Sequence, residues 1–160
     1  MGLAATYTML LAGCGAVSAI LFSLRQSLLA VEFGTGPVLW VLAAATYTAS
    51  LAVEIRARKP LRAPILVGVP ELRGDGSRKA LLTTGIYGAV RHPRYVGATL
   101  GYVASAFLAN YLFLYAALPV FLLLLHTTVL LEERELLERF GNPYRAYMAR
   151  VPRYVPRLRG

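Results

Sequence analysis

The feature that most constrains the fold is a long charge-free stretch. From Tyr95 to Leu131 the chain has 37 residues without a single Asp, Glu, Lys or Arg. As one helix it would reach roughly 55 Å, at about 1.5 Å per residue, whereas the hydrocarbon core of a bilayer is only about 30 Å thick. The stretch must therefore fold back on itself. We expect two antiparallel helices joined by a very tight turn near Asn110-Tyr111, with Gly97 and Gly101 allowing close helix packing.

Two further apolar runs precede this stretch. One has 22 uncharged residues from Leu3 to Leu24, and the other has 18 from Gly36 to Val53. Each suits a transmembrane helix of roughly 20 residues. Only 16% of the residues are charged, against about 25% in soluble domains. The sequence therefore predicts an all-α integral membrane protein, a single domain over residues 1–160 with about four transmembrane helices and a cytosolic C-terminal helical segment.

The distribution of basic residues predicts the orientation. If the N-terminus lies inside, 16 of the 17 Lys and Arg residues fall on one side, and Arg25 is the exception. Basic residues accumulate on the cytoplasmic side of a membrane. We therefore expect a multi-pass protein of a bacterial or archaeal cell membrane, with both termini in the cytoplasm. The net charge of +9 then fits anionic lipid head groups better than nucleic acid, and the lone Cys14 excludes a multi-cysteine metal site.

The connecting segments carry weaker signals. Prolines in the loop from Arg56 to Arg94 argue against one long helix there, and a helical turn near Lys79–Leu82 is expected to stop at Gly85. At the other end, Phe140-Gly141 should end the last membrane helix. Asn142-Pro143 then begins another helix, with an N-cap and a first-turn proline.

The charges at the two ends of the hairpin predict a site. Arg91-His92-Pro93 precedes the first helix, and Glu132-Glu133 follows the second. The hairpin brings these groups to the same membrane depth, under a roof formed around Tyr144 and Tyr147. Adjacent glutamates on a helix project about 100° apart, so only one can face inward. Charged groups at the hydrocarbon edge are functional candidates, although lipid anchoring and ordinary helix-surface ion pairs would explain the same residues.

Two motifs at these positions resemble a known family. GIYGAVRHPRYVG at residues 85–97 and LLEERELLERFGNPYRAYMARVP at residues 130–152 are similar to the C-terminal signature of integral-membrane methyltransferases. This family includes isoprenylcysteine carboxyl methyltransferases and phospholipid N-methyltransferases. The resemblance covers residues 79–156 and implies an S-adenosylmethionine site at the cytosolic face, reached by a lipophilic substrate from the bilayer.

The resemblance also implies which residues form the site. Those expected around the cofactor are Lys79, Ala80, Leu81, Leu82, Tyr87, His92, Pro93, Arg94, Tyr95 and Glu132. Arg91 and Glu133 are the candidate catalytic residues, with lipid anchoring as the alternative for Arg91. The chemistry agrees, because a sulfonium and an ammonium favour a nearby carboxylate, while the carboxylate of the cofactor needs a cation or N–H donors.

One position departs from the family pattern. Prenylcysteine enzymes carry an arginine about one turn before the acidic pair, where this chain has Thr128. We therefore expect methyl transfer but not a prenylcysteine substrate. An amine acceptor would need a base, Glu133 or His126, although His126 is expected to be a hydrogen-bonded core residue. A carboxylate acceptor would need a cation, such as Arg91. Rival interpretations are a non-catalytic lipid-binding protein and a membrane reductase of related architecture.

Overall fold

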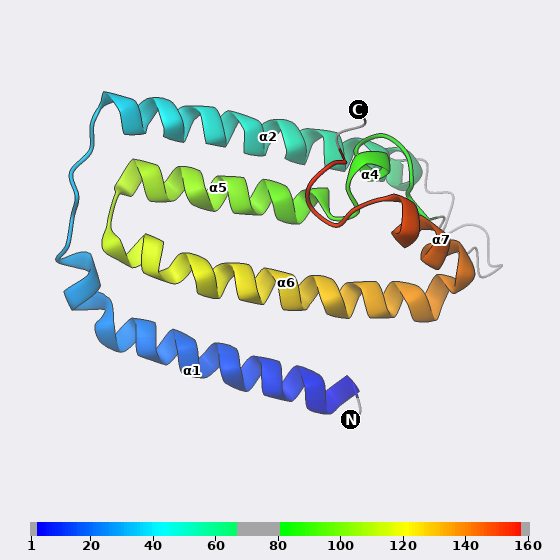
Figure 1. The fold of residues 1–160 in the computed structure, drawn as a ribbon, viewed down its shortest axis with the longest axis horizontal. Coiled ribbons are helices and arrows are strands. Elements are labelled where there is room, and N and C mark those ends of the chain that lie inside the picture. The colour runs from blue at the N-terminus through cyan, green and yellow to red at the C-terminus, as the bar shows by residue number, and fades with distance from the viewer. Residues whose placement is uncertain (1–2, 67–80, 158–160) are drawn as a thin grey trace.

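The computed structural model describes residues 3–66 and 81–157, which are mostly helical and contain no strand. The helices are α1 (Leu3–Leu29), α2 (Pro37–Leu66), α4 (Ile86–Ala89), α5 (Pro93–Ala109), α6 (Leu112–Phe140) and α7 (Asn142–Arg150). Four of them lie side by side in the order α2, α5, α6, α1, and successive ones run in opposite directions (Figure 1). The short helices α4 and α7 gather at one end of this row, where α1 also begins.

The closest packing in the bundle joins α2 to α5. Ser50 Oγ donates a hydrogen bond to the Gly97 carbonyl at 2.7 Å. A Cβ at Gly101 would lie 3.2 Å from Ser50 Oγ, so a larger residue there would crowd the hydroxyl. Glycines at these positions let the two backbones approach, and the expected packing face of α5 is confirmed.

The hairpin turns at the predicted place. Asn110 ends α5 in the left-handed conformation, with a φ of 49°, which asparagine tolerates better than most residues. Backbone bonds tie the turn to the connection between α1 and α2: Phe33 N–H donates to the Asn110 carbonyl, and Leu112 N–H donates to the Val31 carbonyl, each at 3.1 Å. Tyr115 OH donates to Asn110 Oδ1 at 2.7 Å. These hydrogen bonds hold the hairpin turn against the α1–α2 connection at the end of the bundle opposite α4 and α7.

Two of the described helices are long and apolar enough to cross a membrane, namely Pro37–Lys59 of α2 and Leu112–Phe140 of α6. Only 11% and 6% of their most apolar windows are buried within the chain. Trp40 is 56% exposed and Leu123 is 64% exposed. A core helix of a soluble protein would be covered by other parts of the chain. These exposed apolar faces therefore require an apolar environment outside the chain.

The segments around the predicted loop differ from expectation in three respects. Helix α2 continues through Pro60 to Leu66, because a proline removes one hydrogen bond and kinks a helix without always ending it. The expected turn of helix before Gly85 is wrong for Leu81 and Leu82, which are not helical. Instead Gly85, with a φ of 63°, precedes α4.

At the C-terminal end the predicted boundary is confirmed, with one shift. Helix α6 ends at Phe140, and Gly141 follows with a φ of 61°. The N-cap of α7 is Gly141, and Asn142 is its first helical residue, without a side-chain capping bond. The left-handed backbone of Gly141 makes the sharp turn, so the asparagine is not needed as a cap.

Candidate functional site

The C-terminal tail forms one wall of the site. Arg91 N–H donates to the Pro152 carbonyl at 2.8 Å, and His92 N–H donates to the Arg153 carbonyl at 3.1 Å. The tail thus lies against the residues that lead into α5. Pro93 occupies the first turn of α5 as predicted, where its missing N–H costs nothing.

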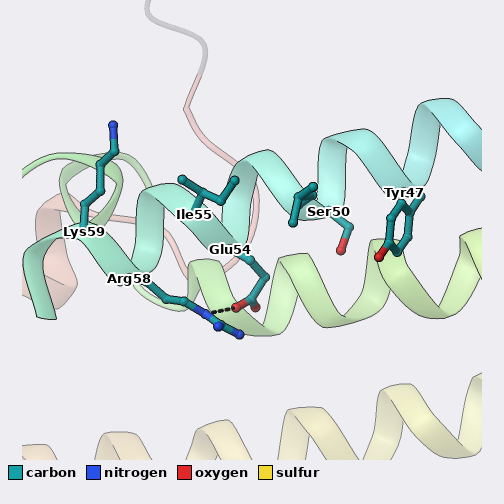
Figure 2. Close-up of a pocket in the computed structure, with 7 residues that line it drawn as sticks. Tyr47, Ser50, Glu54, Ile55, Arg58 and Lys59 are labelled. Carbon is teal, nitrogen blue, oxygen red and sulfur yellow. Dashed lines mark hydrogen bonds and ion pairs between the residues drawn. The ribbon is translucent and has the colours of Figure 1, made fainter. Parts of the chain in front are cut away.

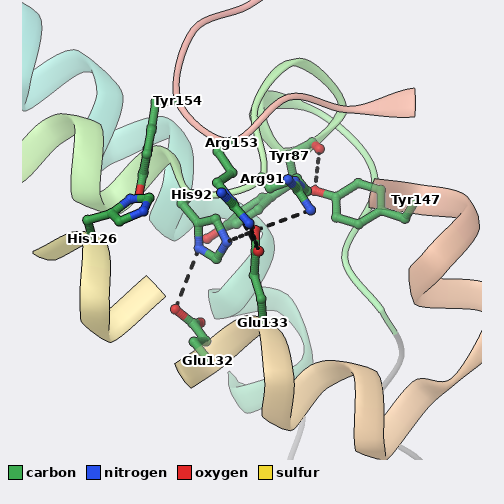
Figure 3. A network of polar contacts seen from close by, with 9 residues as sticks. All are labelled: Tyr87, Arg91, His92, His126, Glu132, Glu133, Tyr147, Arg153 and Tyr154. Carbon is green, nitrogen blue, oxygen red and sulfur yellow. Dashed lines mark hydrogen bonds and ion pairs between the residues drawn. The ribbon is translucent and has the colours of Figure 1, made fainter. Parts of the chain in front are cut away.

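Glu133 is the inward-facing glutamate of the pair, and it is only 3% exposed. Arg153 donates to its Oε2 at 3.0 Å from Nε and at 2.8 Å from Nη2. Arg91 Nη1 and His92 Nε2 lie 3.2 and 3.1 Å from its Oε1. These partners surround the carboxylate (Figure 3), and the hydrogen bonds to Glu133 raise the pKa of Arg153. A buried carboxylate is tolerated when cations compensate it in this way.

Glu132 lies differently, since its side chain is 44% exposed. Its Oε2 is nevertheless buried and accepts no hydrogen bond from the described residues. His92 Nδ1 is 3.5 Å away, longer than an ordinary N–H···O bond. Arg91 Nε and Tyr144 OH are likewise buried without a hydrogen-bond partner in the described part of the chain. Buried polar atoms without partners are rare in folded proteins, and they mark places where a ligand or water can bind.

The three residues with these unpartnered atoms, Glu132, Arg91 and Tyr144, line one cavity of about 290 Å³ under α7, here called the α7 cavity. Its described lining consists of Leu81, Leu82, Tyr87, Arg91, His92, Arg94, Glu132, Leu136, Arg139, Phe140, Tyr144 and Tyr147. The lining therefore combines aromatic and aliphatic walls with charges of both signs. Such a mixture suits a small ligand that carries both charges and an aromatic part.

A second cavity, of about 300 Å³, adjoins the first on the side of α2 and is called the α2 cavity. The two share Tyr87, Arg91, His92, Arg94 and Glu132. The α2 cavity is further lined by Glu54, Pro93, Tyr95, Ala98 and Leu125. The shared residues form one wall that is common to both cavities where they adjoin.

An apolar groove of about 390 Å³ continues from the α2 cavity along α5 and α6. It shares Tyr95 and Leu125 with that cavity. His126 lies in this groove, half-buried, with its Nδ1 hydrogen-bonded to Tyr154 OH at 2.9 Å. The expected hydrogen bond of His126 is present, but its partner comes from the C-terminal tail and the residue is not in the core.

The predicted roof is confirmed for Tyr144 and Tyr147, which are 1% and 4% exposed. Tyr147 OH donates to the Tyr87 carbonyl at 2.7 Å, and Tyr87 OH donates to the Ala57 carbonyl at 3.3 Å. This chain of bonds links α7 through α4 to α2. Burial raises the pKa of Tyr144 and of Tyr147 to about 12.

Most of the site residues expected from the sequence come together. Those that line one or both cavities are Leu81, Leu82, Tyr87, Arg91, His92, Pro93, Arg94, Tyr95 and Glu132. Glu133 lines neither cavity and lies directly behind their shared wall. Lys79 and Ala80 fall outside the described residues.

Three residues at the site were not expected from the sequence: Glu54, Arg153 and Tyr154. The only signal for Glu54 was an acidic residue directly after an apolar run. Arg153 and Tyr154 lie in a proline-flanked tail, where neither spacing nor periodicity predicts a tertiary contact.

The fold and the site together define an α-helical membrane protein with a polar, two-cavity site at one end of its bundle. Residues 72–143 match the phospholipid methyltransferase family. Over 89 residues, or 55% of the chain, the sequence is 37% identical to methanethiol S-methyltransferase 2 of Bradyrhizobium diazoefficiens. Over 71 residues, or 44% of the chain, it is 35% identical to methanethiol S-methyltransferase 1 of the same organism.

These matches confirm the resemblance to membrane methyltransferases. The matched regions cover 32% and 24% of the two relatives, so the chain corresponds to only part of their length. No solved structure matches the chain.

Proposed function

We propose that the protein is an S-adenosylmethionine-dependent methyltransferase that acts at the cytosolic face on a lipophilic, membrane-dissolved substrate. One observation carries this proposal. Glu132 Oε2 and Arg91 Nε, buried polar atoms of opposite charge and without hydrogen-bond partners, belong to residues that line one cavity within the family-matched region. A zwitterionic ligand would satisfy both atoms.

The residues present fit this cofactor. Glu132 would face its ammonium and sulfonium charges, while Arg91 and Tyr144 would face its carboxylate, because charge-assisted hydrogen bonds favour these pairings. Leu81, Leu82 and the tyrosine roof offer an apolar and aromatic wall to the adenosine part. When bound, the cofactor supplies a methyl group that the positive sulfur has already activated for displacement.

The chain's own contribution would be positioning. The α2 cavity would receive the polar head of the acceptor, and the apolar groove would take its hydrophobic part. The wall shared by the two cavities would then hold donor and acceptor next to each other, and such proximity and orientation lower the barrier to transfer of a methyl group that is already activated. Glu133 would act indirectly, by holding Arg91 and His92 in this wall.

The acceptor decides whether a base is required. An amine must lose a proton before or during transfer. Glu133 already receives three cationic or N–H partners, so His126 in the apolar groove is the better placed candidate. A thiol, the acceptor that the relatives' names indicate, would be active as a thiolate. A carboxylate would need a cation: Thr128 does not supply one, and Arg91 would face the carboxylate of the cofactor.

The proposed topology is that of a single multi-pass domain. Helices α1 and α5 would cross the membrane together with α2 and α6, giving four spans with both termini in the cytoplasm. The support is that 16 of the 17 basic residues then lie on the side of α4 and α7, as the distribution of basic residues in membrane proteins requires. Membrane lipids would surround the bundle, and no nucleic-acid partner is proposed.

A transfer assay separates this proposal from its rivals, a non-catalytic lipid-binding protein and a membrane reductase of related architecture. The purified protein would be placed in phosphatidylglycerol vesicles with methyl-labelled S-adenosylmethionine and phosphatidylethanolamine or 1-dodecanethiol. We expect label in the organic phase, and a strong reduction with Glu132→Gln but not with Glu135→Gln on the exposed face of α6. Label that stays in the aqueous phase with every acceptor would support the rivals.

A further inference from the structure

Glu54 lies at the site but outside the family-matched region. It is the residue common to the α2 cavity and to a groove of about 510 Å³ along α2, which is otherwise lined by Tyr47, Ser50, Leu51, Ile55, Arg58 and Lys59. In Figure 2 its side chain leaves α2 toward α5, while Lys59 points away. The Glu54 side chain is 23% exposed. A carboxylate near the end of the apolar part of a helix, facing the bundle, is a candidate for function.

The glycine at the end of RHPRYVG makes room for this carboxylate. A Cβ at Gly97 would lie 3.0 Å from Glu54 Oε1 and 3.2 Å from Glu54 Cγ. Such contacts are tighter than side chains normally accept. The side chain of Glu54 therefore packs against α5 at a position where no side chain blocks it, and it lines the cavity that Glu132 also lines.

An ordinary ion pair does not account for this placement. Arg58 Nε lies 3.3 Å from Glu54 Oε2, but the Arg58 side chain is 61% exposed. Exposed pairs four residues apart contribute about 0.3–0.5 kcal/mol. Glu138 makes the same kind of pair with Arg134 at 3.2 Å, with both side chains more than half exposed, and it lines neither cavity of the site. The two glutamates therefore form a matched comparison.

We infer that Glu54 binds the polar head of the methyl acceptor and is a specificity-determining residue of the site. This inference rests on the proposed function. Glu54 lines the α2 cavity but not the α7 cavity, where the donor would lie. Because an ionised carboxylate only accepts hydrogen bonds, the acceptor's head must donate one. Glu54 therefore selects head groups with N–H, O–H or S–H donors over carboxylate heads.

The first experiment compares Glu54→Gln with Glu138→Gln in phosphatidylglycerol vesicles. Phosphatidylethanolamine and 1-dodecanethiol serve as acceptors, and S-adenosylhomocysteine binding is measured by calorimetry. We expect Glu54→Gln to raise the acceptor KM by about tenfold and to leave the Kd of S-adenosylhomocysteine within about twofold. Glu54→Asp should restore part of the loss, and Glu138→Gln should change neither quantity.

The second experiment tests the glycine. Gly97→Ala should push the Glu54 carboxylate aside and raise the acceptor KM in the same way. Gly101→Ala is the control, because a Cβ there meets Ser50 Oγ at 3.2 Å on the same helix pair without touching Glu54. Equal effects at Gly97 and Gly101 would instead mean general disturbance of helix packing.

The outcomes separate the inference from the proposed function. If the unaltered protein binds no S-adenosylhomocysteine, the proposed function fails and the inference fails with it. If it binds the ligand but methylates neither acceptor, the proposed transfer fails and the inference fails with it. If it methylates an acceptor and Glu54→Gln leaves the acceptor KM unchanged, the inference alone is overturned. If Glu54→Gln weakens S-adenosylhomocysteine binding by as large a factor as it raises the acceptor KM, Glu54 belongs to the donor site. That result would also overturn the inference.

Discussion

Arg153 donates from Nε and Nη2 to the carboxylate of Glu133, at 3.0 and 2.8 Å from Oε2. This contact joins the C-terminal tail to α6 across the site. Together with Arg91 and His92, Arg153 compensates this buried carboxylate. The tail is thereby part of the candidate site and not an appendage to it.

A double-mutant cycle tests this contact. Arg153→Gln and Glu133→Gln should each destabilise the folded protein, and the double variant should lose less than the sum of the two. We expect a coupling free energy of about 1.5–3 kcal/mol, because both hydrogen bonds involve charged groups. Denaturant unfolding in detergent measures it, with Arg134→Gln and Glu138→Gln as the exposed control pair. Additive effects at Arg153 and Glu133 would contradict the contact.

Much of the helical framework could be predicted from single residues. The absence of charge from Tyr95 to Leu131 required a turn, and Asn110 supplied a residue that tolerates the left-handed conformation. Pro93 and Gly141 marked helix boundaries because each restricts or permits a particular backbone conformation. Helix α2 beyond Arg56 was missed, because the prolines that suggested its end lie within it.

The site was predicted only as far as local patterns extend. The hairpin brings Arg91-His92-Pro93 and Glu132-Glu133 together by topology alone, and helical periodicity requires only one glutamate to face inward. The inward one, Glu133, is held by Arg91, His92 and also Arg153, and the position of Arg153 follows from tertiary bonds of the tail. The approach of Glu54 to Gly97 is also a contact between distant segments. No pattern within either segment predicts it.

The buried tyrosine roof predicts a dependence on pH. The pKa of Tyr147 is raised from 10.0 to about 12 by burial. A raised pKa in the folded state contributes stability that is fully present below pH about 10 and is lost as pH rises toward 12, because the unfolded chain releases its proton first. The tyrosinate absorbance of Tyr147 is the difference between the unaltered protein and Tyr147→Phe. With rising pH, this difference should increase with a midpoint near pH 12. A midpoint near 10 would mean that Tyr147 is not buried.

Topology can be tested with single cysteines after Cys14 has been replaced. Thr35 is exposed between α1 and α2, and Asn142 is exposed at the start of α7. We expect a membrane-impermeant maleimide to label Thr35→Cys in intact cells and to label Asn142→Cys only after permeabilisation. The reverse pattern would contradict the proposed orientation. Labelling of both from outside would contradict an odd number of crossings between the two positions.

Thr128 predicts which acceptors are disfavoured. It is exposed on α6, one turn before Glu132 and three residues after Leu125, which both line the α2 cavity. Arg91 lines this cavity but already faces Glu133, and Arg94 is exposed. A buried acceptor carboxylate would therefore lack a cation of its own and carry a penalty of several kcal/mol. The unaltered protein should therefore methylate a farnesylcysteine analogue poorly.

Arginine at this position gives the matched test. Thr128→Arg should raise transfer to the farnesylcysteine analogue, whereas Thr127→Arg, on a different face of α6, should not. Efficient turnover of the analogue by the unaltered protein would show that Thr128 does not determine the acceptor class.

Calorimetric titration with S-adenosylhomocysteine tests the central claim most directly, because it measures the donor site without assuming any acceptor. The account predicts saturable binding to the unaltered protein. It also predicts an affinity about ten- to hundredfold lower for Glu132→Gln, since a charge-assisted contact contributes about 1.5–3 kcal/mol. Glu135→Gln, which changes an exposed glutamate on the same helix, should bind like the unaltered protein. No binding to the unaltered protein, or equal small effects at Glu132 and Glu135, would contradict the account.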